Sequence, residues 1–175
     1  MDEEELSRPS VAFIVGRFQP FHLGHQAMAD LAYSQCDRVV VLVGSSQAGG
    51  TNENPFSFET RKQAIQAIFP KAIVLPLPDI GVGDVPAWGD YLFRTIRQAG
   101  YEPAIFVTGV ESRRYHWFNE ENAPALKTVS LERSILPISG TEVRSLMFSN
   151  DPSWKKWVDP RAVPIYEEAL ALLKK

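Results

Sequence analysis

Residues 11–25 have the pattern of a strand, a tight loop and the start of a helix, and this order constrains the fold more than any other stretch. The apolar run of residues 11–15 stops at a glycine, and a helical pattern begins near His22 and His25. In an open parallel sheet, the loop after the first strand borders the crevice where ligands bind, and the next helix offers free N–H groups to an anion. The two imidazoles and the guanidinium of Arg17 therefore indicate phosphate chemistry.

The rest of the chain repeats this alternation of strand and helix. Apolar runs rich in β-branched residues are typical of strands buried in a parallel sheet, and amphipathic patterns separate them. Pro76 interrupts one run and predicts a strand at the edge of the sheet. We expect strands at 11–15, 39–43, 72–77, 103–107 and 126–131, and helices at 22–35, 57–69, 87–99, 111–118, from 139 and from 152 onward.

These elements predict one α/β domain, a Rossmann-like open parallel sheet flanked by helices. The domain spans residues 11–175, including its C-terminal helices, after a short acidic arm of residues 1–10. Trp154 and Trp157 in the last segment are expected to pack, and a homo-oligomer with a contact there stays open.

Composition excludes several classes of protein. The 175 residues carry a net charge of -3, whereas a general nucleic-acid binder needs a surplus of Lys and Arg, so we expect no nucleic-acid partner. Cys36 is the sole cysteine, which excludes an intrachain disulfide and fits a reducing, cytoplasmic setting. No apolar run approaches the length of a membrane span, so no membrane partner is expected either.

The two neighbouring histidines, taken by themselves, allow more than one interpretation. His22 and His25 are three residues apart at a helix start, so both can face one point. Phosphate binding and a purely local role, in which one ring caps the loop and the other binds a carbonyl, fit this spacing about equally well. Zinc fits less well because no third ligand lies nearby.

Two arginines and a tryptophan are further candidates. Arg61 follows a predicted helix cap and Arg144 follows a second cap of the capping-box type, so each can reach a ligand or remain a surface charge. Trp88 can stack on a base or pack in the core.

Two motifs resemble signatures of one superfamily. The string GRFQPFHLGH of residues 16–25 resembles the GxFxPxHxGH signature of the nucleotidylyltransferases, which transfer a nucleoside monophosphate from a triphosphate to a phosphorylated acceptor. ISGTEVR of residues 138–144 resembles their second signature, ISSTxxR. Gly140 replaces a serine and so lacks one side-chain contact to phosphate, while Thr141 and Arg144 are kept.

The finer pattern is similar to the nicotinamide mononucleotide adenylyltransferases of the archaeal type and of bacterial bifunctional proteins. The similar stretches are GSSQA at 44–48, NPFSFETR at 54–61, PLPDI at 76–80 followed by Trp88, and FVTG at 106–109. Thr60 and Val110 depart from the family, which usually has Glu and Asn there.

The resemblance implies that ATP and nicotinamide mononucleotide are joined into NAD, with release of pyrophosphate and no covalent enzyme intermediate. Such a transfer depends on positioning and on charge stabilisation, and Mg²⁺ held by the phosphates rather than by protein ligands is the expected cofactor. The implied catalytic residues are His22, His25, Arg17, Arg61 and Arg144; the ATP-binding residues are Gly16, Phe18, Gly24, Thr108, Gly109, Ser139 and Thr141; the residues for nicotinamide mononucleotide are Asp79, Trp88 and Ser45.

Two alternatives remain at this point. The same chemistry could act on another acceptor, such as phosphopantetheine, or a sugar or glycerol phosphate with CTP. A nucleotide sensor without turnover is the second alternative, although it has no evident need for His22, His25 and Arg144 together.

Overall fold

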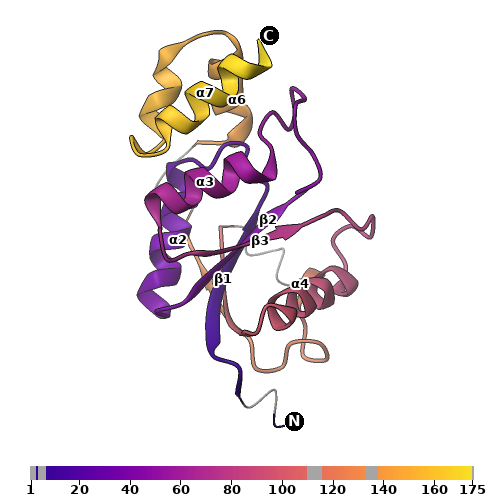
Figure 1. The fold of residues 1–175 in the computed structure, drawn as a ribbon. Coiled ribbons are helices and arrows are strands. Elements are labelled where there is room, and N and C mark those ends of the chain that lie inside the picture. The colour runs from indigo at the N-terminus through magenta and orange to yellow at the C-terminus, as the bar shows by residue number, and fades with distance from the viewer. Residues whose placement is uncertain (1–2, 4–6, 110–115, 133–137, 175) are drawn as a thin grey trace.

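A five-stranded parallel sheet forms the centre of the computed structural model, which describes residues 3, 7–109, 116–132 and 138–174 (Figure 1). The strand order is β3-β2-β1-β4-β5, and each neighbouring pair is parallel. The strands are β1 (Ser10–Gly16), β2 (Val39–Gly44), β3 (Ile73–Leu77), β4 (Glu102–Thr108) and β5 (Lys127–Ser130). The predicted open Rossmann-like sheet is therefore confirmed.

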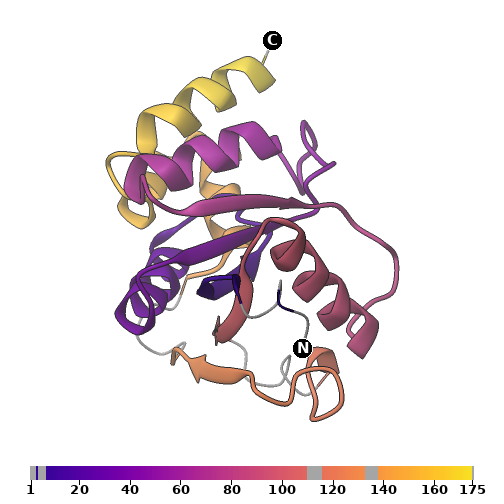
Figure 2. The ribbon, with the colours of Figure 1, turned by 60° about the horizontal axis from the view of Figure 1, so that its bottom comes forward.

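Helices cover both faces of this sheet, as Figures 1 and 2 show. On one face α2 (Leu23–Gln35) and α3 (Phe58–Ile68) pack on alternate residues of β1, such as Ile14. On the other face α4 (Pro86–Gln98) packs on Phe13. Every residue of β2 is buried, which explains why its sequence is a continuous apolar run.

The strand order reverses beside β1. The chain proceeds from β1 to β2 and β3 on one side, and then crosses to β4 and β5 on the other. Ligands of open α/β sheets bind at such a reversal, outside the carboxyl ends of the strands. At the far end of the order, β3 is an edge strand and contains Pro76, as predicted.

The C-terminal segment differs from the single helix that its pattern predicts. It consists of a 3-10 helix, η2 (Pro152–Trp157), and a separate helix α7 (Val163–Leu173), after α6 (Gly140–Phe148). Pro160 has no backbone N–H to continue a helix, and Asp159 instead accepts hydrogen bonds from Arg161. In both views α7 lies alongside α3, on its side away from the sheet.

The structure also bears on the expectations for the C-terminal tryptophans, for residues 111–118 and for the acidic arm. Trp154 is buried in the core and Trp157 packs against it, so both tryptophans pack within the chain, and a homo-oligomer stays a prediction. Most of the helix expected at 111–118, and part of the acidic arm, lie outside the described residues. None of the helices in the described ranges is long and apolar enough to cross a membrane.

Candidate functional site

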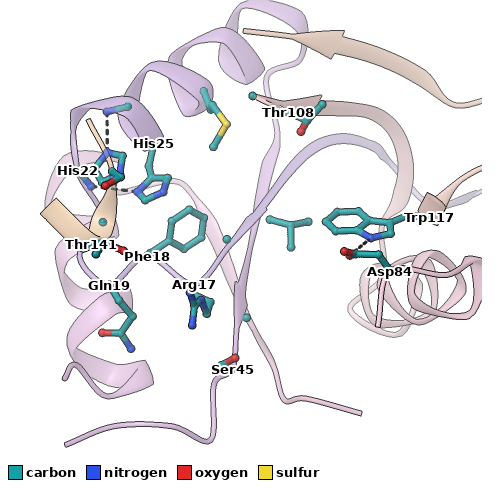
Figure 3. Close-up of a pocket in the computed structure, with 18 of the residues that line it drawn as sticks. Arg17, Phe18, Gln19, His22, His25, Ser45, Asp84, Thr108, Trp117 and Thr141 are labelled. Carbon is teal, nitrogen blue, oxygen red and sulfur yellow. Dashed lines mark hydrogen bonds between the residues drawn. The ribbon is translucent and has the colours of Figure 1, made fainter. Parts of the chain in front are cut away.

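A cavity of about 720 Å³ lies at the carboxyl ends of β1, β2 and β4, beside the reversal of strand order (Figure 3). It brings together residues from the two ends of the chain, including the loop after β1 and the start of α6. The predicted residues that line it are Gly16, Arg17, Phe18, His22, Gly24, His25, Ser45, Asp79, Trp88, Thr108, Gly109, Ser139, Thr141 and Arg144. Arg61 is the predicted site residue that does not line it.

His22 and His25 form the cap of α2. His22 Nδ1 accepts the N–H of Gly24 at 3.0 Å, and His25 Nδ1 accepts the N–H of His22 at 3.3 Å. The two rings are nearly parallel, with centroids 3.7 Å apart. Because Nδ1 of His22 is an acceptor, its neutral ring carries the proton on Nε2. The capping role is thus confirmed, and it leaves His22 a ring N–H as a donor.

The surroundings keep both rings neutral. Burial lowers the pKa of His22 to about 4, since only 5% of the residue is exposed. Burial and the neighbouring His22 lower the pKa of His25 well below its usual value, against the effect of a hydrogen bond with the Pro20 backbone. Phe18 and Phe21 enclose the His25 ring at 4.8 and 5.7 Å between centroids. Positive charge in the cavity therefore comes from arginines and not from imidazolium.

Arg144 is one of these arginines and lies over the first turn of α6. Its Nη1 donates to the carbonyl oxygen of Gln19 at 2.8 Å, and Nη2 donates to Thr141 Oγ1 at 3.2 Å. A Cβ at position 140 would lie 3.1 Å from Nη1, so Gly140 leaves room for the guanidinium. Burial and the charge of Arg17 lower the pKa of Arg144, and both arginines line the cavity.

The start of α6 also presents backbone donors. The capping box expected from the sequence is present: Ser139 Oγ accepts the N–H of Glu142 at 3.2 Å, and the Glu142 carboxylate accepts the N–H of Ser139 at 2.9 Å. These bonds satisfy part of the helix end, and the neighbouring residues Gly140 and Thr141 face the cavity. A helix start of this kind favours an anion.

Arg61 departs from its expected place beside a phosphate. It is fully buried, and its Nη1 donates to the carbonyls of Arg17 and Gly44 at 2.9 and 2.8 Å. Its other donors reach the carbonyls of Ser45, Ala48 and Ser57. Burial lowers the pKa of Arg61 to about 10, so the side chain keeps its charge at neutral pH. The residue therefore ties the carboxyl ends of β1 and β2 to α3.

Across the cavity from the histidines, where Asp84 and Trp117 lie, the lining is acidic and aromatic (Figure 3). Asp79 accepts hydrogen bonds from Ser45 Oγ at 3.0 and 3.1 Å and from Gln47 Nε2 at 2.8 Å. Trp88 is partly buried, and its ring lies 5.3 Å from that of Tyr91. Trp88 packs against the core and also lines the cavity, so it is placed for either of the two roles considered from the sequence.

Several cavity residues were not expected from the sequence. Trp117 Nε1 donates to Asp84 Oδ1 at 2.7 Å, and both side chains line the cavity (Figure 3). Asp84 lies in the same Gly-rich loop as Asp79, so the sequence could have indicated Asp84 as a cavity residue. Trp117 gave no signal, because its place depends on how the segment after β4 returns to the sheet. Met28 and Glu132 also line the cavity and belong to no motif, whereas Gln19 lines it from within the GRFQPFHLGH motif although no role was expected for it.

The donors at the histidine end suit an anion. They are imidazole, guanidinium, hydroxyl and backbone N–H groups, whereas a bare cation needs oxygen or imidazole acceptors. Within residues 3, 7–109, 116–132 and 138–174, no three His, Cys, Asp or Glu side chains come together in a way that could hold a metal ion.

Comparison with known proteins of similar sequence points to one family of enzymes. Residues 13–146 match the cytidylyltransferase-like family. The nicotinamide-nucleotide adenylyltransferase of Aeropyrum pernix is 30% identical over 162 residues, which cover 89% of each chain. That of Pyrococcus horikoshii is 32% identical over 158 residues, which cover 87% of this chain and 79% of the relative.

A solved structure agrees in fold. A bifunctional NMN adenylyltransferase/ADP ribose pyrophosphatase from Francisella tularensis superposes with a TM-score of 0.73 at 21% identity. The match covers 94% of this chain and 52% of that chain, so this chain spans about half the length of the bifunctional protein. From the family match and the identity to the curated relatives, we conclude that the chain belongs to the cytidylyltransferase-like family and, within it, to the nicotinamide-nucleotide adenylyltransferases.

Proposed function

We propose that the chain joins ATP and nicotinamide mononucleotide into NAD and pyrophosphate by direct in-line transfer. The observation that carries the proposal is a single cavity with two unlike ends: His22, Arg17 and Arg144 at one end, and Asp79 and Trp88 at the other. One end suits a triphosphate, and the other suits a nucleotide with an aromatic base.

The chemistry at the phosphate end is charge stabilisation. A phosphate oxygen of the acceptor attacks the α-phosphorus of ATP, the bond to pyrophosphate breaks, and negative charge spreads over the equatorial oxygens. The neutral ring N–H of His22 and the cations of Arg17 and Arg144 stabilise this charge without transferring a proton. No side chain needs to become a nucleophile.

Mg²⁺ is the cofactor that we infer for this reaction. The donors at the phosphate end suit anions, so the phosphate oxygens would hold the ion, which would neutralise part of their charge. The neighbour from Francisella tularensis was crystallised with AMP and a manganese ion, which supports a divalent metal in that protein.

At the acceptor end, Trp88 stacks on the pyridine ring and Asp79 orients the nucleotide. The carboxylate of Asp79 is already held by Ser45 and Gln47, which fixes its direction. Arg61 contributes indirectly: it fixes the carbonyls at the ends of β1 and β2, and so the loops that carry Arg17 and Ser45.

Incubation of the purified chain with ATP, Mg²⁺ and nicotinamide mononucleotide tests the proposal. NAD and pyrophosphate should form in equal amounts, and neither should form when one substrate is left out. Parallel reactions offer phosphopantetheine with ATP and glycerol phosphate with CTP. A product in either of these, with no NAD in the first, would reassign the acceptor. Nucleotide binding without any product would identify a sensor.

A further inference from the structure

The loop that carries the histidines is held by a residue from the far end of the chain. Tyr166 of α7 is fully buried, and its hydroxyl oxygen accepts the backbone N–H of Phe21 at 2.9 Å. Phe21 immediately precedes His22, the cap residue of α2. A single hydrogen bond therefore joins the C-terminal helix to the backbone beside the His22 ring.

Other ties to this loop come from different directions. The Gln19 side chain donates to the carbonyl of Phe56 at 2.8 Å and accepts the N–H of Phe56 at 2.9 Å, both buried. The Gln19 carbonyl accepts from Arg144, as described above. The rings of Phe56 and Tyr166 are 4.7 Å apart, so the anchors on the two sides of the loop are packed against each other.

The Tyr166 hydroxyl is the acceptor of the backbone N–H of Phe21, a group that is costly to leave unpaired. A buried backbone N–H without a partner costs about 1 to 3 kcal/mol, so loss of the hydroxyl would drive the loop toward another arrangement. Phe21 has little freedom to find water, because the residue is fully buried. Any shift of Phe21 is passed to His22, whose own N–H is held by His25.

We propose that Tyr166 is a positioning residue for adenylyl transfer, because its hydroxyl holds Phe21 and thereby aims the His22 ring at the phosphates. The inference rests on the proposed function. In-line transfer is sensitive to such placement, since a displacement of about 1 Å can reduce turnover on the order of 100-fold.

The Tyr166→Phe variant tests this inference, with Tyr33→Phe as the matched control. Tyr33 also has a hydroxyl oxygen shielded from solvent, but that oxygen has no hydrogen-bond partner in the part of the chain that the structure describes. Tyr166→Phe should lower kcat about 10- to 100-fold while KM for both substrates changes by about twofold or less. Tyr33→Phe should match the wild type.

The outcomes separate this inference from the proposed function. If the wild type makes no NAD, the proposed function fails, and the positioning role of Tyr166 fails with it. If the wild type is active and folded Tyr166→Phe keeps a kcat within about twofold of it, the hydroxyl does not position the site.

A second variant tests the inference if Tyr166→Phe does not fold. Site-specific replacement of Tyr166 by 3-fluorotyrosine keeps the hydroxyl and weakens it as an acceptor, so kcat should fall in the same direction by a smaller factor. An unchanged kcat for the fluorinated enzyme overturns the inference.

Discussion

The two ends of the cavity are built in opposite ways. At the phosphate end, His22 is buried and its ring is fixed by a backbone N–H. At the acceptor end, residues 78–85 form an exposed loop in which Gly81 and Gly83 adopt left-handed φ of 73°. Ile80 and Val82 of this loop are 42% and 39% exposed although they are apolar. In the proposed reaction, the end fixed by buried hydrogen bonds, the rigid end, carries the transfer chemistry, and the end formed by the exposed loop receives the acceptor.

This difference follows from what each end must do. Stabilisation of developing charge requires donors that are placed before the reaction begins, because reorienting them would add to the barrier. Recognition of an acceptor tolerates a loop that closes on the ligand, since the binding free energy can order it.

The largest effect should come from a substitution that removes a donor at the rigid end and keeps the fold. His22→Asn retains a side chain that caps helices well but has no ring N–H at the position of Nε2. We expect kcat to fall about 100- to 1000-fold, with a much smaller loss of ATP affinity, as for removal of a preorganised donor. Turnover and nucleotide binding, measured separately, check this. The exposed His116→Asn serves as the control.

The pH dependence of stability gives the same variant a second readout. Because the folded pKa of His22 is about 4, below its usual 6.5, the unfolded chain binds more protons between these values. The stability from this group is complete above pH 6.5 and is lost as the pH falls toward 4. His22→Asn should flatten this part of the curve. An unchanged slope would show that the His22 ring is not shielded in solution.

A smaller but still large effect should come from the support beneath the cavity. Arg61→Met removes a buried guanidinium whose donors reach five backbone carbonyls. The carbonyls left unpaired should lower the free energy of unfolding by about 3 kcal/mol. Chemical denaturation measures this, and Gln63→Met, on an exposed position of α3, is the control. If stability is kept and only KM for ATP rises, Arg61 contacts the ligand directly.

The sequence is informative where a local pattern determines the structure. The apolar runs predicted the strands, Pro76 predicted the edge strand, and Ser139 with Glu142 predicted the cap of α6. The sequence also predicted that the two histidine rings lie close together, because their spacing at a helix start restricts where the rings can point.

The remaining features depend on contacts between distant segments. The spacing of Arg61 within its helix does not show that the ends of β1 and β2 turn their carbonyls toward it. The bond between Asp84 and Trp117 joins two loops that no motif relates. The break at Pro160 had a local signal, but the aromatic spacing around it favoured one continuous helix.

The smallest effect tests the acceptor end. Three carboxylates line the cavity, those of Asp79, Asp84 and Glu132. Because like charges repel, nicotinate mononucleotide with its carboxylate should bind there less well than nicotinamide mononucleotide with its neutral amide. Asp84→Asn keeps an oxygen for Trp117 Nε1 and removes one charge. Since Asp84 is exposed, water screens it, and the preference for the amide in kcat/KM should fall only about fivefold. Competition between the two acceptors measures the ratio, with the exposed Asp90→Asn as control. A drop in kcat for both acceptors alike would instead make Asp84 part of the rigid end, and the division of the cavity would have to be redrawn.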